Sequence, residues 1–256
     1  MLSVKNICLN YGGIRAVDDM SLEVGQGEIV GLIGTNGAGK TSLFNVITGF
    51  SIASSGSVAF EGEDLTRWLP WQIAEAGMVR TFQTPLGFPR MTVVENMLVF
   101  APEERVASTS VFGGQGPSRD LLDRVMSVLG DFDLNKQANL WVGDLSAPEL
   151  KMLELARVMM ASPKIMLLDE PAAGVNPALM ERTVSQIRSL RDQGVTFLVV
   201  DHNLGFILQL CERTYAMAHG QLIASGDTRS VIDDPEVIRI YIGSDFEEEK
   251  AMTSTK

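Results

Sequence analysis

One eight-residue stretch has the residue types and the spacing, G-x-x-x-x-G-K-[ST], that bind phosphate. It reads Gly34-Thr35-Asn36-Gly37-Ala38-Gly39-Lys40-Thr41. Glycines let successive backbone N–H groups point inward, and the start of a following helix adds its positive dipole end to the same anion site. In such a loop the Lys40 ammonium reaches the β- and γ-phosphates, while the Thr41 hydroxyl ligates Mg²⁺.

The flanks of this stretch decide between a phosphate-binding loop and an ordinary glycine-rich turn. An apolar run at residues 29–33 has the composition of a buried strand, and residues 42–47 have that of a helix. A strand, a glycine loop and a helix in this order form the context that phosphate binding needs. We therefore predict a phosphate-binding loop here.

Two adjacent carboxylates, Asp169 and Glu170, follow the apolar run at residues 165–168. Adjacent acids alone are typical of a turn. At the carboxyl end of a buried strand, however, carboxylates lie where they can hold Mg²⁺ and activate water. We expect Asp169 to bind Mg²⁺ through water and Glu170 to act as the general base.

A second apolar run, residues 195–200, ends in Asp201-His202-Asn203. A histidine at a strand end is as often structural as catalytic. His202 is the third polar feature at the carboxyl end of a predicted strand, which favours a catalytic role. His219 lies in a turn between two short strands, and we predict no role for it.

The remaining elements divide into strands first and helices later. Residues 2–9, 16–24 and 55–62 have strand character, and Tyr11 lies on the loop after the first of these. Tyr11 either stacks on an adenine ring or is a plain aromatic at a strand end. From about residue 68 to 160 the periodicity becomes helical, at 69–76, 93–100, 121–129 and 147–160. This pattern predicts an inserted helical subdomain.

Two segments interrupt that helical region, and one follows the predicted domain. A short strand at 78–83 ends in Gln83, and residues 101–119 are rich in Ser, Gly and Pro, which indicates a mobile surface loop. We expect one domain over residues 2–243, followed by an acidic, disordered tail at 244–256.

Composition narrows the range of partners. The net charge is −11, with 45% apolar residues. The isoelectric point is about 4.7. An acidic chain lacks the basic footprint that binds nucleic acid and is repelled by anionic lipid, so a membrane role requires a protein partner. No apolar stretch approaches the ~18 residues of a membrane-spanning helix, and the first residues do not resemble a signal peptide, so we expect a cytoplasmic protein.

With these features in this order, the chain resembles the ATP-binding subunits of ABC transporters from Val4 to about Gly243. The motifs that match, in chain order, are the adenine-stacking Tyr11, the Walker A motif at 34–41, the Q-loop Gln83, the Walker B Asp169, the catalytic Glu170 and the switch His202. The resemblance implies an α/β fold of the P-loop NTPase class: an ABC-type nucleotide-binding domain with an antiparallel β subdomain and an inserted helical subdomain. Residues 80–83, 91–96, 169–177 and 234–243 resemble the LivG type of branched-chain amino acid importers, a class that also carries other amino acids, urea, short amides and aromatic acids.

The resemblance also implies ligands and partners. Two such subunits meet head to tail, with each ATP between one Walker A motif and the signature motif of the other subunit. ATP would contact Tyr11, Asn36, Gly37, Ala38, Gly39, Lys40, Thr41, Ser42 and Ser146, and Mg²⁺ would be held by Thr41, Gln83 and Asp169. Glu170, His202 and Gln83 would be catalytic. Two integral membrane permease subunits would dock near Phe88, Pro89 and Arg90, with a solute-binding protein acting indirectly, and the chain would lie at the inner face of the plasma membrane.

The chain departs from the family at the signature Leu-Ser-x-Gly-Gln, which here reads Leu145-Ser146-Ala147-Pro148-Glu149. Pro148 has no N–H to offer a phosphate, and Glu149 brings a negative charge. The helix should still form, because Ser146 and Glu149 fit a capping box and proline is tolerated in a first turn. We infer a heterodimer with two unequal ATP sites.

Three other functions compete with this interpretation. A non-transport ATPase of the same superfamily usually has paired cassettes or basic surfaces, which this acidic single cassette lacks. A small-molecule kinase normally lacks a glutamate directly after the Walker B aspartate. A regulatory cassette that mainly binds ATP would account for the altered signature, but the intact Glu170 and His202 favour an active enzyme.

Overall fold

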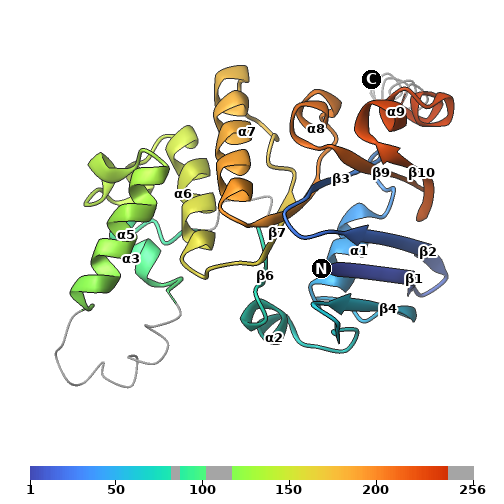
Figure 1. Cartoon of the computed structure of the whole chain (residues 1–256), viewed down its shortest axis with the longest axis horizontal. Helices are drawn as coiled ribbons and strands as arrows, with labels where there is room; N and C mark the ends of the chain where they lie inside the picture. The colour runs from blue at the N-terminus through green and yellow to red at the C-terminus, as the bar shows by residue number, and fades with distance from the viewer. Residues whose placement is uncertain (82–86, 102–116, 242–256) are drawn as a thin grey trace, which may run out of the picture. The chain divides into compact units, whose positions relative to one another are not determined.

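The computed structural model describes residues 1–81, 87–101 and 117–241, which form two compact units. The core unit contains residues 1–80 and 164 onward, and the inserted unit contains residues 81–163. Gln83, most of the loop expected at 101–119 and the tail expected at 244–256 lie outside the described residues. Figure 1 shows the elements of both units along the chain.

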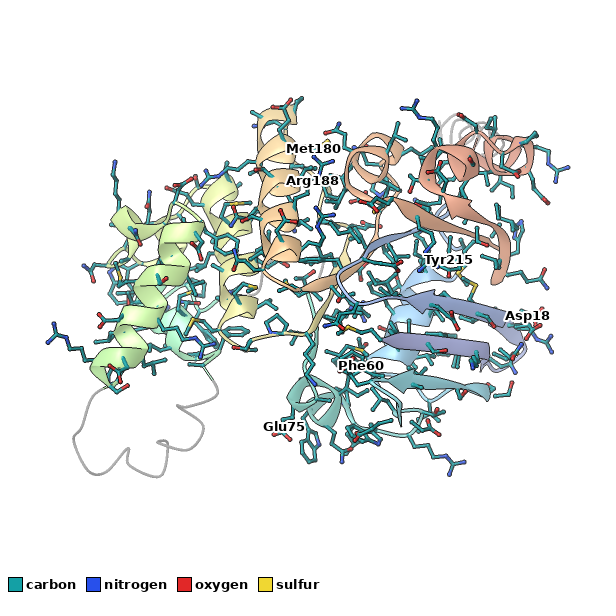
Figure 2. All side chains as sticks on the ribbon, viewed as in Figure 1. Asp18, Phe60, Glu75, Met180, Arg188 and Tyr215 are labelled. Atoms are coloured by element: carbon teal, nitrogen blue, oxygen red, sulfur yellow. The ribbon has the colours of Figure 1, made fainter. Side chains whose placement is uncertain are left out.

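An antiparallel sheet forms one part of the core unit, with strand order β2-β1-β4-β5. Its strands are β1 (Leu2–Tyr11), β2 (Ile14–Val24), β4 (Ser55–Phe60) and β5 (Glu63–Asp64). Buried and exposed residues alternate along much of β1 and β2, because one face of the sheet meets the core. Phe60, labelled in Figure 2, is one of the buried side chains. The antiparallel strands expected from the sequence are confirmed.

A six-stranded sheet forms the other part, in the order β10-β9-β3-β8-β7-β6. Its strands are β3 (Ile29–Ile33), β6 (Met78–Arg80), β7 (Ile165–Asp169), β8 (Thr196–Val200), β9 (Arg213–Ala218) and β10 (Gln221–Asp227). The neighbouring strands from β9 through β3, β8 and β7 to β6 all pair in parallel. Every residue of β3, β7 and β8 is buried. Continuous apolar runs suit strands that are covered on both faces, so the predicted buried strands are confirmed.

The helices of the core unit are α1 (Lys40–Ile47), α2 (Pro70–Glu75), α7 (Pro177–Asp192), α8 (Leu204–Leu210) and α9 (Thr228–Ile232), and residues 235–241 are also helical. Apolar residues of α1 share one hydrophobic core with residues of both sheets. Asn176 caps α7 by accepting a hydrogen bond from the N–H of Leu179. No helix among the described residues is long and apolar enough to cross a membrane.

The inserted unit is built from α3 (Val93–Leu98), α5 (Arg119–Asp131) and α6 (Ala147–Met159), with 3-10 turns at Asn135–Gln137 and Val142–Asp144. The helices expected near 93–100, 121–129 and 147–160 are present. The helix expected at 69–76 is present as α2, but it belongs to the core unit. The unit boundary follows β6 instead of Trp68, because β6 pairs with β7 in the large sheet.

Asn96 organises the segment at residues 88–92 of the inserted unit. Its side chain is fully buried. The amide oxygen accepts a hydrogen bond from the N–H of Phe88. The two hydrogens of the amide nitrogen are donated to the carbonyls of Phe88 and Thr92, at 3.1 and 3.0 Å, and the carbonyl of Met91 lies 3.4 Å from the same nitrogen. One buried side chain therefore satisfies several backbone groups of this turn.

Gly39 fits the start of α1 tightly against β2, which predicts a difference between two loop glycines. Both Gly37 and Gly39 have positive φ, at 78° and 102°. A Cβ on Gly39 would lie 2.3 Å from the carbonyl oxygen of Ala16, whereas one on Gly37 meets nothing within 4 Å. We expect Gly37→Ala to lower the free energy of unfolding by about 1 kcal/mol. Gly39→Ala should cost at least about 2 kcal/mol more.

Urea unfolding without nucleotide measures both changes under the same conditions. Equal losses for the two variants would show that the approach of β2 to Gly39 does not constrain the loop.

Candidate functional site

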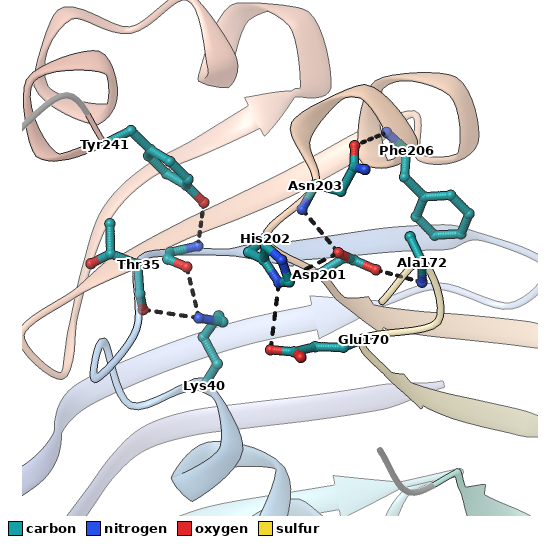
Figure 3. A network of polar contacts seen from close by, with 10 residues as sticks. Thr35, Lys40, Glu170, Ala172, Asp201, His202, Asn203, Phe206 and Tyr241 are labelled. Atoms are coloured by element: carbon teal, nitrogen blue, oxygen red, sulfur yellow. Dashed lines mark hydrogen bonds and ion pairs between the residues drawn. The ribbon is translucent and has the colours of Figure 1, made fainter. Parts of the chain in front are cut away.

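The polar groups expected to do chemistry lie at one edge of the six-stranded sheet. The loop that contains Gly34 follows β3, Asp169 ends β7, and Asp201 follows β8. The three strands are parallel, and Asp169 is in register with Val200 of β8. Figure 3 shows Lys40, Glu170 and His202 close together at this edge. An edge of this kind, at the carboxyl ends of parallel strands, is where open α/β sheets bind ligands.

The backbone of the phosphate-binding loop has the conformation that its glycines permit. Gly34, Gly37 and Gly39 all have positive φ, and Gly39 is the N-cap of α1. No side chain caps this helix start. The loop thus presents an uncapped helix N-terminus, an arrangement that fits a phosphate group.

The Lys40 ammonium lies inside the loop and donates hydrogen bonds to the carbonyls of Gly34, at 2.7 Å, and Thr35, at 2.9 Å. Burial lowers the pKa of Lys40, and the charges of Glu170, Asp169 and Asp201 oppose that shift. Lys40 is therefore a buried cation close to three carboxylates. A bound phosphate can attract its ammonium group away from the two carbonyls.

The remaining loop residues differ in exposure. Asn36, Gly37 and Thr41 are exposed, Ser42 is half-buried and Ala38 is buried. The backbone N–H groups and side-chain hydroxyls of residues 36–42 can therefore bind an anion together with the Lys40 ammonium. These are the loop residues that the sequence predicted to contact ATP.

Glu170 and His202 face each other across the ends of β7 and β8. The Nδ1 atom of His202 lies 3.6 Å from Oε1 of Glu170. Figure 3 marks this contact with a dashed line. The Glu170 backbone has a φ of 50°, and its N–H donates to the carbonyl of Val200. The His202 side chain is 55% exposed and that of Glu170 is 21% exposed, so both can meet a ligand.

Asp201, to which the sequence analysis gave no role, holds these two segments together. Its side chain is fully buried and accepts hydrogen bonds from the N–H groups of Ala172 and Asn203, both at 2.9 Å. The segment after Glu170 is therefore tied to the segment that carries His202. Asp201 directly precedes His202 in the sequence, and this position is the signal that could have identified Asp201.

Asp169, the expected magnesium ligand, forms an ion pair with Arg80. The guanidinium Nη2 lies 2.7 Å from Oδ2 of Asp169, and Nη1 donates to Asn45 at 2.6 Å. Arg80 also lies over the ring of Phe44, 5.6 Å from its centroid. Both charged side chains are buried. No motif in the sequence predicts this role of Arg80, because the pair joins residues 89 positions apart.

The expected magnesium ligands would supply only part of the coordination shell of the ion. Thr41 and Asp169 supply oxygen atoms, which Mg²⁺ prefers, and Gln83 lies outside the described residues. Within the described ranges, no group of three or more His, Cys, Asp or Glu side chains could hold a metal ion. This donor set suits Mg²⁺, which usually keeps several waters and binds phosphate oxygens besides one or two protein ligands.

Tyr11 is the last residue of β1, where it pairs with Ile14 of β2 and does not lie on the loop expected from the sequence, and it is 49% exposed. Its hydroxyl is 3.3 Å from Oγ of Ser51. An exposed aromatic ring is available to stack on a base, which stays a prediction.

The segment that the sequence predicts to be an altered signature, residues 145–149, lies in the inserted unit at the start of α6. Ser146 is the N-cap, and its N–H and hydroxyl both donate to the Glu149 carboxylate, at 2.8 and 2.6 Å. Gln137 donates to the other oxygen of Glu149 at 2.8 Å. The helix therefore forms around Pro148, and the predicted capping box is confirmed.

Comparison with known proteins identifies relatives along nearly the whole chain. The family described as "ABC transporter" matches residues 17–173. The chain is 36% identical over 250 residues to the "Probable branched-chain amino acid transport ATP-binding protein LivG" of Methanocaldococcus jannaschii, covering 95% of this chain and 97% of the relative. It is 36% identical over 251 residues to the "High-affinity branched-chain amino acid transport ATP-binding protein LivG" of Escherichia coli strain K12, covering 95% and 98%.

Solved structures with the same fold include one with nucleotide. The "ADP conformation of MJ1267, an ATP-binding cassette of an ABC transporter" is 35% identical, with a TM-score of 0.85 over 95% of this chain and 98% of that chain. A nucleotide-free ATP-binding cassette from an ABC transporter is 33% identical, with a TM-score of 0.83 over 94% and 98%. The α/β fold of the P-loop class expected from the sequence is confirmed.

The ion pair between Arg80 and Asp169 predicts a large loss of stability when the cation is removed. We expect Arg80→Met to lower the free energy of unfolding by about 3 kcal/mol, because it leaves a buried carboxylate without this cation. Arg15→Met is the matched control, since Arg15 forms an ion pair with Asp18 while 60% exposed. That variant should lose far less, because exposed ion pairs contribute little. Similar losses in urea unfolding of the two variants would contradict the importance of the buried pair.

Proposed function

The chain belongs to the ABC transporter family, and from this membership we propose that it hydrolyses ATP to power a membrane importer of the branched-chain amino acid type. The cargo would be an amino acid or a similar small polar or organic-acid compound. The observation that carries the proposal is the meeting of Lys40, Glu170 and His202 at one sheet edge, in a chain 36% identical to LivG proteins along almost its full length. The ADP conformation of a relative supports nucleotide binding at such a site.

We infer the roles of the site residues from their positions. Backbone N–H groups between Asn36 and Ser42 would hold the phosphates, and Lys40 would exchange its two carbonyl partners for phosphate oxygens. Mg²⁺, held by Thr41, Asp169 and Gln83, would neutralise charge on the phosphates. Tyr11 would stack on the adenine ring.

Glu170 is the proposed general base. Its carboxylate is partly exposed at the end of β7, so it can accept a proton from a water aligned with the terminal phosphate. His202, 3.6 Å away, would orient that carboxylate. Asp201 would support both residues through its hydrogen bonds to the N–H groups of Ala172 and Asn203.

The contacts of Glu149 support the proposal of two unequal sites in a heterodimer. The hydroxyl of Ser146 donates to the carboxylate of its own Glu149, and Pro148 has no N–H. The signature that this chain would lend to a partner cassette therefore offers little to a terminal phosphate. The site built on this chain's own Walker A motif would be active when the partner supplies a complete signature.

The proposed assembly places the chain in the cytoplasm, against the inner face of the plasma membrane. Besides the second cassette, it would contain two integral membrane permeases that dock near Phe88, Pro89 and Arg90, and it would act with a solute-binding protein. Phe88 is 47% exposed, as a docking residue needs to be. Nucleic acid is not an expected partner, since the net charge is −11.

A regulatory cassette that mainly binds ATP is the second candidate, because the hydroxyl of Ser146 is engaged within its own chain. A non-transport ABC-type ATPase is an alternative of the same superfamily. The next experiment separates an active enzyme from a regulatory binder.

Removing the proposed general base should abolish hydrolysis by the paired cassettes. We expect ATPase activity when this chain is co-expressed with the cassette encoded beside it, but not from this chain alone. Glu170→Gln should reduce the activity of the pair at least about 100-fold, because the water loses its proton acceptor. Glu181→Gln is the control, since Glu181 is an exposed acid on α7. Activity that survives Glu170→Gln would place the working site on the partner and favour the regulatory candidate.

Restoring the family signature should increase the activity of the same pair. The double change Pro148→Gly with Glu149→Gln removes the negative charge beside Ser146 and returns an N–H, so the second site should begin to hydrolyse ATP. Circular dichroism checks that α6 survives the change. If steady-state ATPase and transport rates stay unchanged while the helix remains intact, the two sites are not unequal for this reason.

A further inference from the structure

A tyrosine far along the chain contacts the first glycine of the phosphate-binding loop. The hydroxyl of Tyr241 accepts a hydrogen bond from the N–H of Gly34, with the nitrogen and oxygen 2.8 Å apart. Residues 235–241 are helical, so Tyr241 reaches the loop from a helix that follows α9. Figure 3 shows its ring beside Thr35, on the side of the loop opposite the Lys40 stem.

The backbone N–H and the backbone carbonyl of Gly34 each form a hydrogen bond with a side chain. Its N–H donates to Tyr241, and its carbonyl accepts from the Lys40 ammonium at 2.7 Å. Its backbone has a φ of 157°, and a Cβ at this position would lie 2.3 Å from the carbonyl oxygen of Met217 in β9. The loop therefore begins at a buried residue with little freedom to move, and Tyr241 supplies one of the restraints.

The environment of Tyr241 keeps its hydroxyl protonated and neutral. Burial raises the pKa of Tyr241 to about 12, and the nearby charge of Asp201 acts in the same direction. The hydroxyl therefore remains a neutral acceptor for the Gly34 N–H throughout the physiological range.

We propose that Tyr241 is a positioning residue for nucleotide binding: by fixing the N–H of Gly34, it holds the phosphate-binding loop in its binding conformation before ATP arrives. A loop that is already ordered loses less conformational entropy when it binds phosphate, so this hydrogen bond raises affinity without touching the ligand. Nothing in the spacing of the family motifs assigns this role. The inference rests on the nucleotide site proposed above.

The test compares two tyrosines that accept a hydrogen bond from a backbone N–H. Tyr241→Phe removes the acceptor of the Gly34 N–H and keeps the ring. Tyr215→Phe removes the acceptor of the Glu23 N–H at 3.1 Å in the same unit. The Tyr215 hydroxyl also accepts from Arg213 at 2.7 Å and bonds to the Glu23 carbonyl, so its hydrogen bonds go to β2 and β9. Tyr215 is labelled in Figure 2. Binding of a fluorescent ATP analogue to each purified chain without Mg²⁺ gives the affinity, and thermal unfolding gives the stability.

We expect Tyr241→Phe to weaken nucleotide binding roughly fivefold or more, as the loss of one hydrogen bond predicts. In the paired cassettes it should raise KM for ATP by a similar factor while kcat changes less than about twofold, because Glu170 and His202 are untouched. Tyr215→Phe should lower the unfolding temperature without changing the affinity. In the wild-type chain without nucleotide, hydrogen exchange followed by NMR should show a slowly exchanging Gly34 amide.

Four results would overturn the inference. They are wild-type affinity in Tyr241→Phe, an equal loss of affinity in both variants, a fall in kcat at unchanged KM, and a rapidly exchanging Gly34 amide in the wild-type chain. Failure of the wild-type chain to bind the analogue would instead overturn the nucleotide site itself. The two failures are therefore distinguishable.

Discussion

The burial of three parallel strands on both faces is the constraint on which the rest of this structure depends. Every residue of β3, β7 and β8 is buried, so these strands offer no place along their length for a charged group that meets a ligand. The chemistry is therefore confined to the points where the strands end. Because the strands are parallel and adjacent, those points converge, and Lys40, Glu170 and His202 meet without any motif that joins them in sequence.

The meeting of the strand ends brings several carboxylates close together at partly buried positions, and cations balance their charge. Asp169 pairs with Arg80, and the Lys40 ammonium lies under the combined influence of Glu170, Asp169 and Asp201. Asp201 differs, since its oxygens accept from backbone N–H groups. Each buried charge thus has hydrogen bonds or an opposite charge, as burial requires.

Local patterns in the sequence predicted much of this arrangement. The glycine spacing and its flanks identified the loop, and a serine three residues before a glutamate predicted the start of α6. Arg80, Asp201 and Tyr241 were missed as parts of the site. The partners of Arg80 and Tyr241 lie 89 and 207 positions away, and no local periodicity encodes such pairings. The boundary of the inserted unit was misplaced at Trp68 for a related reason, since only the pairing of β6 with β7 shows where the sheet ends.

The hydrogen bonds of Asn96 have a consequence for the permease docking proposed near Phe88. Because one buried amide bonds to the backbone at Phe88 and Thr92, this turn is held by hydrogen bonds within the chain itself. A prefolded turn is recognised by fit, without the entropy loss that a disordered segment incurs on ordering. A permease that docks at this turn would then be selected by the shape of its surface. A permease of similar amino-acid composition but different surface shape would be excluded.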